Sequence, residues 1–410
     1  MSLSNEIAVI VGAGHAGAEL VASLRQNAYS GRIILIGAEP ELPYRRPPLS
    51  KTYLSGAASR ESLLIRSAGA YDKLQVECWT GTQVLAIDRV NKNILLSDGR
   101  TQPYTKLVLA TGGRPRKLLE PQAQKPNVHY IRTLADIDHL QTDFAAGKHL
   151  LVIGGGYIGL EAASVGIQSG LRVTVLEAAP RVLARVAAPQ ISAFYERAHR
   201  ARGVDVRTGM SVQAFHGEQQ VGSVSLSDGS QLPVDLIVVG IGILPNDELA
   251  RAAGLEVDNG IVVDAYAQTR DPDIFAVGDC AQHVNGFLSR RLRIESVPSA
   301  QEQARTAAHS ICAKRVPHAA VPWFWSDQFD LKLQMVGLSQ GYEQLVMRGD
   351  PETESFSAFY LLDGIVLSVD AINRPQDFMV AKRLVAEQVR VDARELADES
   401  ISLKSLLPAG

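Results

Sequence analysis

The sequence predicts an α/β fold built from two similar strand-and-helix units, the second inserted into the first, followed by a C-terminal α+β domain. Two glycine-rich turns, each lying between an apolar strand and a helix, indicate the repeated unit: IAVIVGAGHAGAEL at 7–20 and LLVIGGGYIGLE at 150–161. A third strand-and-turn segment, DIFAVGDCA at 273–281, comes after the second unit has closed and has no partner there. We therefore expect the first unit to resume beyond the second one.

Each glycine-rich turn is followed by the remaining parts of a βαβ unit. A second apolar strand ends in an acid in both copies, at Glu39 and at Glu177. Each copy later closes with a strand that runs into small residues, KLVLATGGRP at 106–115 and DLIVVGIGILP at 235–245. Strands that are apolar throughout suit parallel sheets covered on both faces. From residue 321 the residue pattern changes: WFWSDQFD is followed by strand-like runs such as FSAFYLL and then by a helical stretch at 376–388.

The spacing of the glycines predicts what the two turns bind. In the pattern Gly-x-Gly-x-x-Gly, the first glycine permits a tight turn, the second admits a pyrophosphate, and the third allows close packing of helix on strand. The pyrophosphate then lies at a helix N-terminus, where free N–H groups favour an anion. Because the motif occurs twice, we expect two Rossmann-like dinucleotide-binding domains. The glycines concerned are Gly12, Gly14, Gly17, Gly154, Gly156 and Gly159.

Acidic residues predict which dinucleotides are bound. Glu177 ends the second strand of its unit, where a carboxylate accepts hydrogen bonds from a ribose 2′-hydroxyl and repels a 2′-phosphate, so NADH is expected in preference to NADPH. Arg181 and Arg185 follow closely and leave NADPH open. Glu39 holds the equivalent place in the first unit, which suits the unphosphorylated ribose of FAD. Asp279, in AVGDCA at a strand's carboxyl end, is expected to accept a ribityl hydroxyl of FAD.

Composition narrows the class of protein. The net charge is −3 and the pI is near 6.3, so no global basic field favours nucleic acid or acidic lipid. No apolar run reaches the ~20 residues that span a bilayer, and the first residues lack a signal-peptide pattern, so a cytoplasmic location is expected. The three cysteines (Cys78, Cys280 and Cys312) are far apart and are interpreted as buried, inert thiols. No metal ligands are proposed.

Several motifs together carry a family resemblance. The two glycine motifs, ATGGRPR, FAVGDCA and the C-terminal domain resemble the two-dinucleotide-binding flavoprotein disulfide reductase superfamily. PPLSK at 47–51, SAFYE, RIESVP, PWFWSDQ and NRP are similar, more narrowly, to the oxygenase-coupled, FAD-dependent NADH:ferredoxin reductases. The resemblance implies an FAD-binding domain at 1–112 and 243–320, an NADH-binding domain at 113–242 and a C-terminal domain at 321–410.

The resemblance also implies roles for single residues. In the family pattern the ribose acid falls at the position of Ala38, so here Glu39, one step on, must reach the ribose. Trp325 is a candidate to shield the flavin. The residues expected to contact FAD are Gly12, Gly14, Ala16, Gly17, Glu39, Lys51, Val84, Arg132, Asp279, Val297 and Trp325. Those expected to contact NADH are Gly154, Gly156, Tyr157, Ile158, Gly159, Glu177 and Gly242.

The segment YRRPPLSK bears on the reaction. Dithiol members of the superfamily carry two cysteines there, and this chain carries none, so a disulfide relay is excluded. A flavin reduced by hydride must then be reoxidised by an acceptor outside the chain. Lys51 is the candidate cation near the reactive edge of the flavin, with Glu161 as its ion-pair partner.

The predicted function is that of an NADH-dependent ferredoxin reductase. The acceptor implied is an acidic two-iron two-sulfur ferredoxin that feeds a haem-thiolate monooxygenase or a ring-hydroxylating oxygenase. The ferredoxin is expected to dock through basic residues, and the enzyme to be a monomer or weak dimer; the basic candidates are Arg66, Arg305, Lys382 and Lys404, with Arg45 and Arg46 beside PPLSK. Alternatives are an NADH oxidase, a monodehydroascorbate reductase-like enzyme, or an apoptosis-inducing-factor-like NADH-binding interaction protein.

Overall fold

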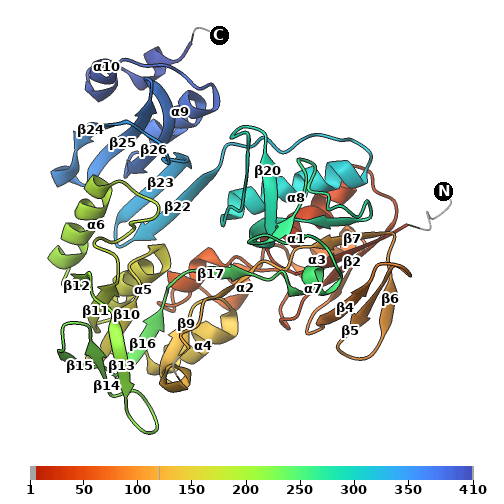
Figure 1. Cartoon of the computed structure of the whole chain (residues 1–410), viewed down its shortest axis with the longest axis horizontal. Coiled ribbons are helices and arrows are strands. Elements are labelled where there is room, and N and C mark those ends of the chain that lie inside the picture. Colours follow the sequence, from red (N-terminus) through yellow and green to blue (C-terminus); the bar gives the residue numbers. More distant parts are fainter. Residues whose placement is uncertain (1–5, 120, 409–410) are drawn as a thin grey trace. The chain divides into compact units, whose positions relative to one another are not determined.

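The computed structural model describes residues 6–119 and 121–408, which form two compact units (Figure 1). The first unit comprises residues 6–45, 60–114 and 244–322, and the second comprises the other described residues. The chain crosses between the units within β8 (Gly113–Pro115) and within β17 (Ile243–Pro245). Residues 46–59, which the sequence analysis assigned to the first domain, belong to the second unit. That unit also joins the segment expected to bind NADH and the C-terminal segment in one compact body.

The first unit is built on a five-stranded parallel sheet. In spatial order its strands are β19 (Ile274–Ala276), β7 (Lys106–Leu109), β1 (Ile7–Val11), β2 (Arg32–Ile36) and β3 (Val76–Trp79). Strand β19 comes last in sequence, yet Ile274 lies opposite Leu107 of β7. The prediction that the first unit resumes after the second is therefore confirmed.

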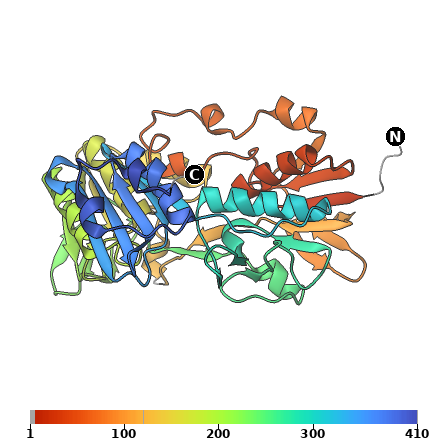
Figure 2. The same cartoon turned by 90° about the horizontal axis from the view of Figure 1, so that it is seen from above.

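Both faces of this sheet are covered, which explains its uniformly apolar strands. On one face Ile10 and Leu35 pack with α1 (His15–Gln26) and α8 (Val297–Ile311). Figure 2 shows α8, in cyan, running beside the red α1. On the other face Val9 and Ile34 pack against the antiparallel strands β4 (Val84–Asp88), β5 (Asn93–Leu96) and β6 (Thr101–Pro103). The remaining elements of the unit are α2 (Arg60–Leu63), α3 (Ala68–Lys73), α7 (Glu248–Ala252), β18 (Ile261–Val262), η3 (Gly278–Cys280), β20 (Ala281–Asn285) and β21 (Arg290–Leu292).

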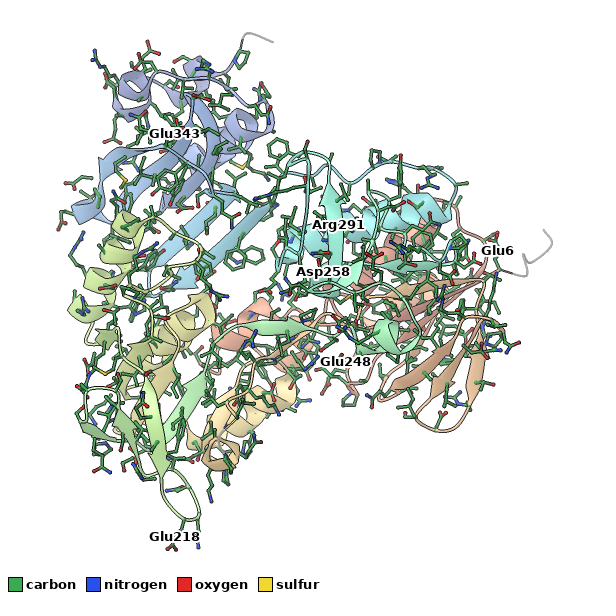
Figure 3. The ribbon with its side chains drawn as sticks, in the orientation of Figure 1. Glu6, Glu218, Glu248, Asp258, Arg291 and Glu343 are labelled. Carbon is green, nitrogen blue, oxygen red and sulfur yellow. The ribbon has the colours of Figure 1, made fainter. Side chains whose placement is uncertain are left out.

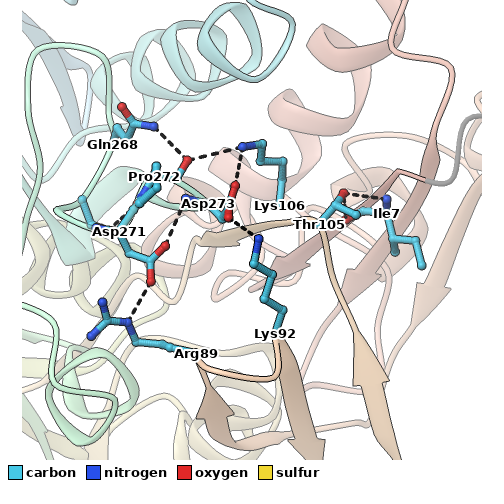
Figure 4. Close-up of polar contacts among 10 residues, drawn as sticks. Ile7, Arg89, Lys92, Thr105, Lys106, Gln268, Asp271, Pro272 and Asp273 are labelled. Atoms are coloured by element: carbon cyan, nitrogen blue, oxygen red, sulfur yellow. Dashed lines mark hydrogen bonds and ion pairs between the residues drawn. The ribbon is translucent and has the colours of Figure 1, made fainter.

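Charged side chains fix the returning strand β19 to the first half of the unit (Figure 4). Asp273, just before β19, pairs with Lys106 on β7 and Lys92, at 2.5 Å in each case. Arg89, after β4, pairs with Asp271 at 2.8 Å. These contacts join residues more than 160 positions apart and place the start of β19 beside β7.

The second unit repeats the plan of the first. Its parallel sheet contains, in spatial order, β12 (Asp205–Thr208), β11 (Arg172–Glu177), β10 (His149–Ile153), β16 (Leu236–Val239) and β9 (Val128–Tyr130). A three-stranded antiparallel sheet again accompanies it, formed by β13 (Val212–His216), β14 (Ser223–Leu226) and β15 (Gln231–Pro233). Figure 3 shows Glu218 at the tip of the loop between β13 and β14. The helices of this part are η1 (Pro47–Ser50), η2 (Pro121–Gln124), α4 (Leu134–Asp143), α5 (Tyr157–Gln168) and α6 (Pro189–Ala201).

The C-terminal part of the second unit is an antiparallel sheet with helices, as the change of residue pattern at 321 predicts. Its strands, in spatial order, are β22 (Trp323–Gln328), β23 (Leu331–Gly337), β26 (Ile365–Ile372), β25 (Ser355–Leu362) and β24 (Gln344–Asp350). The helical stretch expected at 376–388 forms α9 (Pro375–Ala386), and the chain ends with α10 (Ala393–Ala397) and η5 (Leu403–Leu406); η4 (Pro351–Thr353) precedes β25. Within the described residues, no helix is both long and apolar enough to cross a membrane.

Candidate functional site

The first glycine-rich turn has the geometry that a pyrophosphate requires. Gly12 has a φ of +120°, and a Cβ built on it would lie 2.1 Å from the carbonyl oxygen of Ala110. A Cβ on Gly17 would lie 2.2 Å from the carbonyl oxygen of Gly12. Any larger residue at these two positions would therefore break the packing of strand, turn and helix.

Gly14 differs from its two neighbours in the motif. A Cβ built on Gly14 would meet no atom of the described chain within 4 Å. Gly14 is the N-cap of α1 and provides no side-chain cap, so the first N–H groups of the helix lie beside this open space. An anion that enters it would meet both the N–H groups and the positive end of the helix dipole. The turn thus fits the pyrophosphate of a dinucleotide.

The structure brings the Asp279 motif to the same place. Gly278 has a φ of +82°, and its Cβ position lies 3.3 Å from the Cβ of Ala16 on α1 and 3.6 Å from that of Ala300 on α8. Its N–H donates to Gln303 Oε1 at 2.8 Å, which holds the turn against α8. The glycine turn, the half-buried Asp279 and the start of α8 at Val297 therefore converge in the first unit.

Two other residues expected at the FAD site have clear positions in the first unit. Glu39 lies just beyond β2, half-buried, and its Oε2 accepts a hydrogen bond from the Tyr44 hydroxyl at 2.5 Å. This bond fixes the carboxylate near the carboxyl end of the sheet, where ribose acids lie in such folds. Val84 begins β4 and is buried. Its side chain packs in the core beneath the sheet.

The second glycine-rich turn has the same close contacts as the first at the corresponding glycines. Cβ atoms built on Gly154 and Gly159 would lie 2.4 Å from the oxygen of Gly240 and 2.1 Å from the oxygen of Gly154. A Cβ on Gly156 would meet nothing within 4 Å, and this residue is the N-cap of α5. The second turn therefore fits a second dinucleotide.

Glu177 lies beside this second turn and is held there by the backbone. Its Oε2 accepts from the N–H of Gly155 at 2.7 Å and its Oε1 from the N–H of Ala179 at 2.8 Å. Hydrogen bonds of this kind fix the direction of the carboxylate. The remaining lone pairs of both oxygens are available to a ribose.

The other residues expected to contact NADH lie around the same turn. Tyr157 and Ile158 open α5, and Ile158 is 42% exposed although it is a large apolar residue. Gly242 has a φ of +101°, and its Cβ position lies 3.6 Å from Nη2 of Arg185. Arg181, by contrast, points inward and donates to Ala187, Ser192 and Ala184.

The predicted ion pair between Lys51 and Glu161 is confirmed. Lys51 Nζ lies 2.7 Å from Glu161 Oε2, and the side chains are 16% and 1% exposed, respectively. Ser50 donates to the same oxygen at 2.5 Å, and Ser326 donates to Oε1 at 2.6 Å. Burial raises the pKa of Glu161, while the Lys51 charge and the hydrogen bonds oppose that shift. The arrangement holds a largely buried cation against a fully buried counter-ion.

Lys51, Arg132 and Trp325 all belong to the second unit. The carbonyl oxygen of Arg132 accepts from Arg46 at 2.6 Å, which ties the residues after β9 to those before η1. Trp325 is half-buried on β22, and its ring centroid lies 5.6 Å from that of Trp323. The contacts of these three residues with a flavin remain predictions.

The cysteines have the character expected of inert thiols, although only Cys280 is fully buried. Burial raises the pKa of Cys78 to about 11 and also raises the pKa of Cys280 and Cys312. A thiol with a raised pKa is a poor nucleophile at neutral pH.

Sequence reasoning missed four polar residues that hold the predicted ones in place. Ser50 and Ser326 bind Glu161, Gln303 binds the Gly278 turn, and Tyr44 binds Glu39. Ser50 and Ser326 lie within the PPLSK and PWFWSDQ motifs, but no spacing rule pairs segments so distant in sequence.

Comparison with known proteins shows the family of this chain. Residues 7–304 match the pyridine nucleotide-disulphide oxidoreductase family and residues 323–407 match the reductase C-terminal family. Putidaredoxin reductase of Pseudomonas putida is 47% identical over 412 residues, covering 99% of this chain and 98% of its own. A ferredoxin–NAD(P)+ reductase of a Sphingomonas species is 44% identical, covering 97% of each chain.

A solved structure is equally similar. In the crystal structure of the covalent putidaredoxin reductase–putidaredoxin complex, a chain 48% identical superposes with a TM-score of 0.95, covering 98% of both chains. The present chain therefore belongs to the pyridine nucleotide-disulphide oxidoreductase family and, within it, to the ferredoxin reductases, flavoprotein oxidoreductases that use FAD and a nicotinamide dinucleotide.

Proposed function

We propose that this protein transfers electrons from NADH, through bound FAD, to a two-iron two-sulfur ferredoxin that serves an oxygenase. The observation that carries the proposal is the pair of equivalent glycine turns, each with open space at its middle glycine, in a chain without a redox dithiol. Two dinucleotides can bind, and the three cysteines form no disulfide that could accept the electrons. The acceptor must therefore be a separate molecule.

We assign FAD to the first turn and NADH to the second. Bound FAD accepts a hydride from a nicotinamide and returns electrons singly to another carrier. In the first unit, Gly14 admits the pyrophosphate, Glu39 accepts from the ribose, and Asp279 accepts from the ribityl chain. Ala16, Val84 and Val297 shape this site, and we expect Lys51, Arg132 and Trp325 to complete it.

The Lys51–Glu161 pair has a defined part in this assignment. Lys51 supplies a positive charge where negative charge develops as the flavin is reduced, and such fixed charges act without reorganisation. Glu161, almost fully buried, holds the ammonium in one place. The ion pair therefore orients one cation.

The preference for NADH rests on Glu177. Its carboxylate is fixed by two backbone N–H groups, so it cannot turn away to admit a 2′-phosphate. Arg181 is occupied by three internal acceptors, which leaves Arg185 as the residue that could attract a phosphate. The expected result is a preference for NADH over NADPH rather than absolute selectivity.

The proposed docking residues fall into two sets. Arg66 and Arg305 both pair with Glu19 on α1, at 4.0 and 2.8 Å, so part of their charge is neutralised. Lys382 lies over the Trp323 ring at 4.9 Å, and Lys404 is exposed on η5. We propose that an acidic ferredoxin uses charges from these sets, since local charge clusters steer encounter even when net charge is negative. A monomer or weak dimer in the cytoplasm remains the expectation from the sequence.

The identity of the cofactor and donor is tested directly on purified protein. Acid release of the flavin should give FAD, and anaerobic addition of one equivalent of NADH should bleach the visible flavin absorbance within seconds. Lys51→Ala should slow the bleaching about tenfold or more while retaining flavin, because the fixed charge is lost. Release of FMN, or bleaching of the Lys51→Ala protein at the normal rate, would contradict these assignments.

A further inference from the structure

Three buried polar side chains, Ser326, Gln328 and His199, form a hydrogen-bonded series that we call the relay. The relay extends from the Lys51–Glu161 pair to α6. Ser326 donates to Glu161 Oε1 at 2.6 Å, and Gln328 Nε2 donates to Ser326 Oγ at 3.1 Å. His199 Nε2 lies 2.8 Å from Gln328 Oε1. Each of these three side chains is fully buried, with no exposed area. Buried polar groups in proteins are usually hydrogen-bonded to one another, and this relay ends at the carboxyl group of Glu161.

We propose that Ser326, Gln328 and His199 are positioning residues that hold Glu161 as a carboxylate beside Lys51. The inference deepens the proposed function, since it concerns the ion pair that orients the flavin-side cation. Ser326 and Gln328 lie on β22, His199 on α6, and Glu161 on α5, so the relay draws on three elements of the second unit.

The direction of every hydrogen bond in the relay follows from the charge on Glu161. An ionised carboxylate only accepts, so the single hydroxyl hydrogen of Ser326 must point to Glu161. Ser326 must then accept from the amide N–H of Gln328, which leaves the amide oxygen facing His199. His199 must therefore carry its proton on Nε2.

Lys51 and Ser50 both donate to Oε2, so a proton on Glu161 would lie on Oε1 and would reverse this order. If Glu161 held a proton, Ser326 could donate to Gln328, whose amide would turn over and donate to Nε2 of His199. His199 would then be the Nδ1–H tautomer, with that N–H unsatisfied, because Nδ1 is buried and lacks a partner among the described residues. In the Nε2–H tautomer Nδ1 is unpaired only as an acceptor, and orphaned buried N–H groups are rarer in proteins than under-satisfied acceptors. The relay thus favours the carboxylate over the carboxylic acid at Glu161.

Burial keeps the far end of the relay uncharged. Burial lowers the pKa of His199 to about 4, so its ring is neutral at physiological pH. The Phe329 ring packs edge-on against it, with centroids 5.1 Å apart. The titratable and charged groups that interact with Glu161 or His199 are Lys51 just after η1, Tyr157 on α5, Tyr195 on α6 and Arg202 just after α6. Asp327 on β22 and Asp370 on β26 interact with the tyrosines of this group.

The protonation of Glu161 is measured by infrared titration of the holoenzyme. The band of the protonated carboxyl is identified as the one that Glu161→Gln removes. Ser326→Ala should raise the pKa of Glu161 by about one unit, because a hydrogen bond to the charged form is lost. Gln328→Glu should act in the same direction, because the new carboxylate draws the Ser326 hydroxyl toward itself. Ser326→Thr retains the hydroxyl and should restore the wild-type value.

A matched control separates positioning from packing. Ser164, on α5, is buried like Ser326 but lies outside the relay. Its Oγ accepts a hydrogen bond from the N–H of Phe329 at 2.6 Å. Ser164→Ala should leave the Glu161 titration unchanged. In a Glu161→Gln background, Ser326→Ala should no longer change the pH dependence of flavin reduction, since residues acting through one group are not additive.

The tautomer of His199 gives an independent measurement. With 15N-labelled histidine, the holoenzyme at pH 7 should show His199 protonated at Nε2, the resonance being assigned with His199→Gln. An Nδ1–H tautomer, or an unchanged Glu161 pKa in both Ser326→Ala and Gln328→Glu, would overturn the proposal. Neither readout uses NADH or a ferredoxin. A failure of the proposed function would instead appear as absent electron transfer with the relay intact.

Discussion

We expect the middle glycines of the two turns to be required by a ligand and not by the fold. Gly14 has an ordinary φ of −103° and open space at its Cβ position, whereas Gly12 and Gly17 face backbone atoms. Gly14→Val should therefore give a folded protein that retains little FAD, because the new side chain fills the space meant for pyrophosphate. Flavin content and the thermal unfolding midpoint of the flavin-free protein measure the two effects.

Two glycine controls complete this experiment. Gly17→Val should fail to fold, since its Cβ would lie 2.2 Å from a carbonyl oxygen. Gly69→Val, on α3, also meets open space but lies outside the turn and should keep its flavin. A Gly14→Val protein that purifies with a full complement of FAD would show that the pyrophosphate binds elsewhere.

We expect Glu177 to stabilise the second turn and also to bind the ligand. Its bonds to the N–H groups of Gly155 and Ala179 mean that Glu177→Ala should loosen the turn as well as remove the ribose acceptor. We expect kcat/KM for NADH to fall about tenfold or more and the ratio of NADH to NADPH to narrow. Glu177→Arg should raise kcat/KM for NADPH. Unchanged ratios in both variants would assign the discrimination to Arg185.

Sequence reasoning predicted those residues whose chemistry a local motif defines. The glycines follow from a turn whose sterics are local, and the Lys51–Glu161 pair follows from a family pattern. Ser326 and Gln303 could not be found in this way, because each meets a partner that is distant in sequence and only the tertiary fold brings them together. Their hydroxyl and amide groups also have many other uses in proteins.

At the level of elements, the C-terminal sheet contains a buried carboxyl with an unusual environment. Asp370 on β26 accepts from the Tyr360 hydroxyl on β25 at 2.5 Å, while its second oxygen has no partner among the described residues. Burial raises the pKa of Asp370 from 3.8 to about 7, and the Tyr360 hydrogen bond opposes that shift. Between these two pH values the folded protein holds a proton that the unfolded chain has released.

This difference fixes the sign of a pH effect on stability. Because the folded state binds the extra proton, the free energy of unfolding falls as pH rises from about 4 to about 7 by up to ~1.4 kcal/mol per pH unit from this group. Asp370→Asn should remove that contribution. Urea unfolding at pH 5, 6 and 7 measures it, and the wild-type protein should lose stability relative to the variant. A constant difference between the two proteins would refute the buried protonation.

Elements with apolar strands and glycine turns were predicted well, whereas the small antiparallel sheets were not. Strand β19 was placed correctly because DIFAV has no partner in the second unit. The sheets β4–β6 and β13–β15 were missed, although LSDG occurs in both, at 96–99 and 226–229, and Asp-Gly is a strong hairpin signal. The strands on either side are short and half-exposed, so their alternation is weak.

At the scale of the whole molecule, each proposed ferredoxin-docking residue needs a variant of its own. Arg66 donates to the carbonyl oxygen of Ala18 on α1 at 2.7 Å, so charge reversal there would disturb the helix at the FAD turn. Arg305→Gln and Lys404→Glu test docking without removing that contact with Ala18. Each should raise KM for ferredoxin about three- to tenfold at low salt, with a smaller effect at high salt, because screening weakens steering. Turnover with ferricyanide should stay near normal.

Glu19→Gln is the matched control for the arginine variants. It leaves both arginine charges in place and removes their common partner, so ferredoxin KM should stay the same or fall. If ferricyanide and ferredoxin turnover decline together in Arg305→Gln, that arginine supports the fold or the flavin site. If neither declines, the ferredoxin docks elsewhere.

The choice of electron acceptor tests the central claim most directly. NADH-dependent turnover of the purified holoenzyme should be measured side by side with a two-iron two-sulfur ferredoxin, with oxygen and with ascorbyl radical. The account predicts a kcat/KM for ferredoxin at least about a hundredfold above the values for the other two acceptors, and reduction of the ferredoxin by one electron per cluster. Faster turnover with oxygen or ascorbyl radical than with every such ferredoxin tested would contradict it.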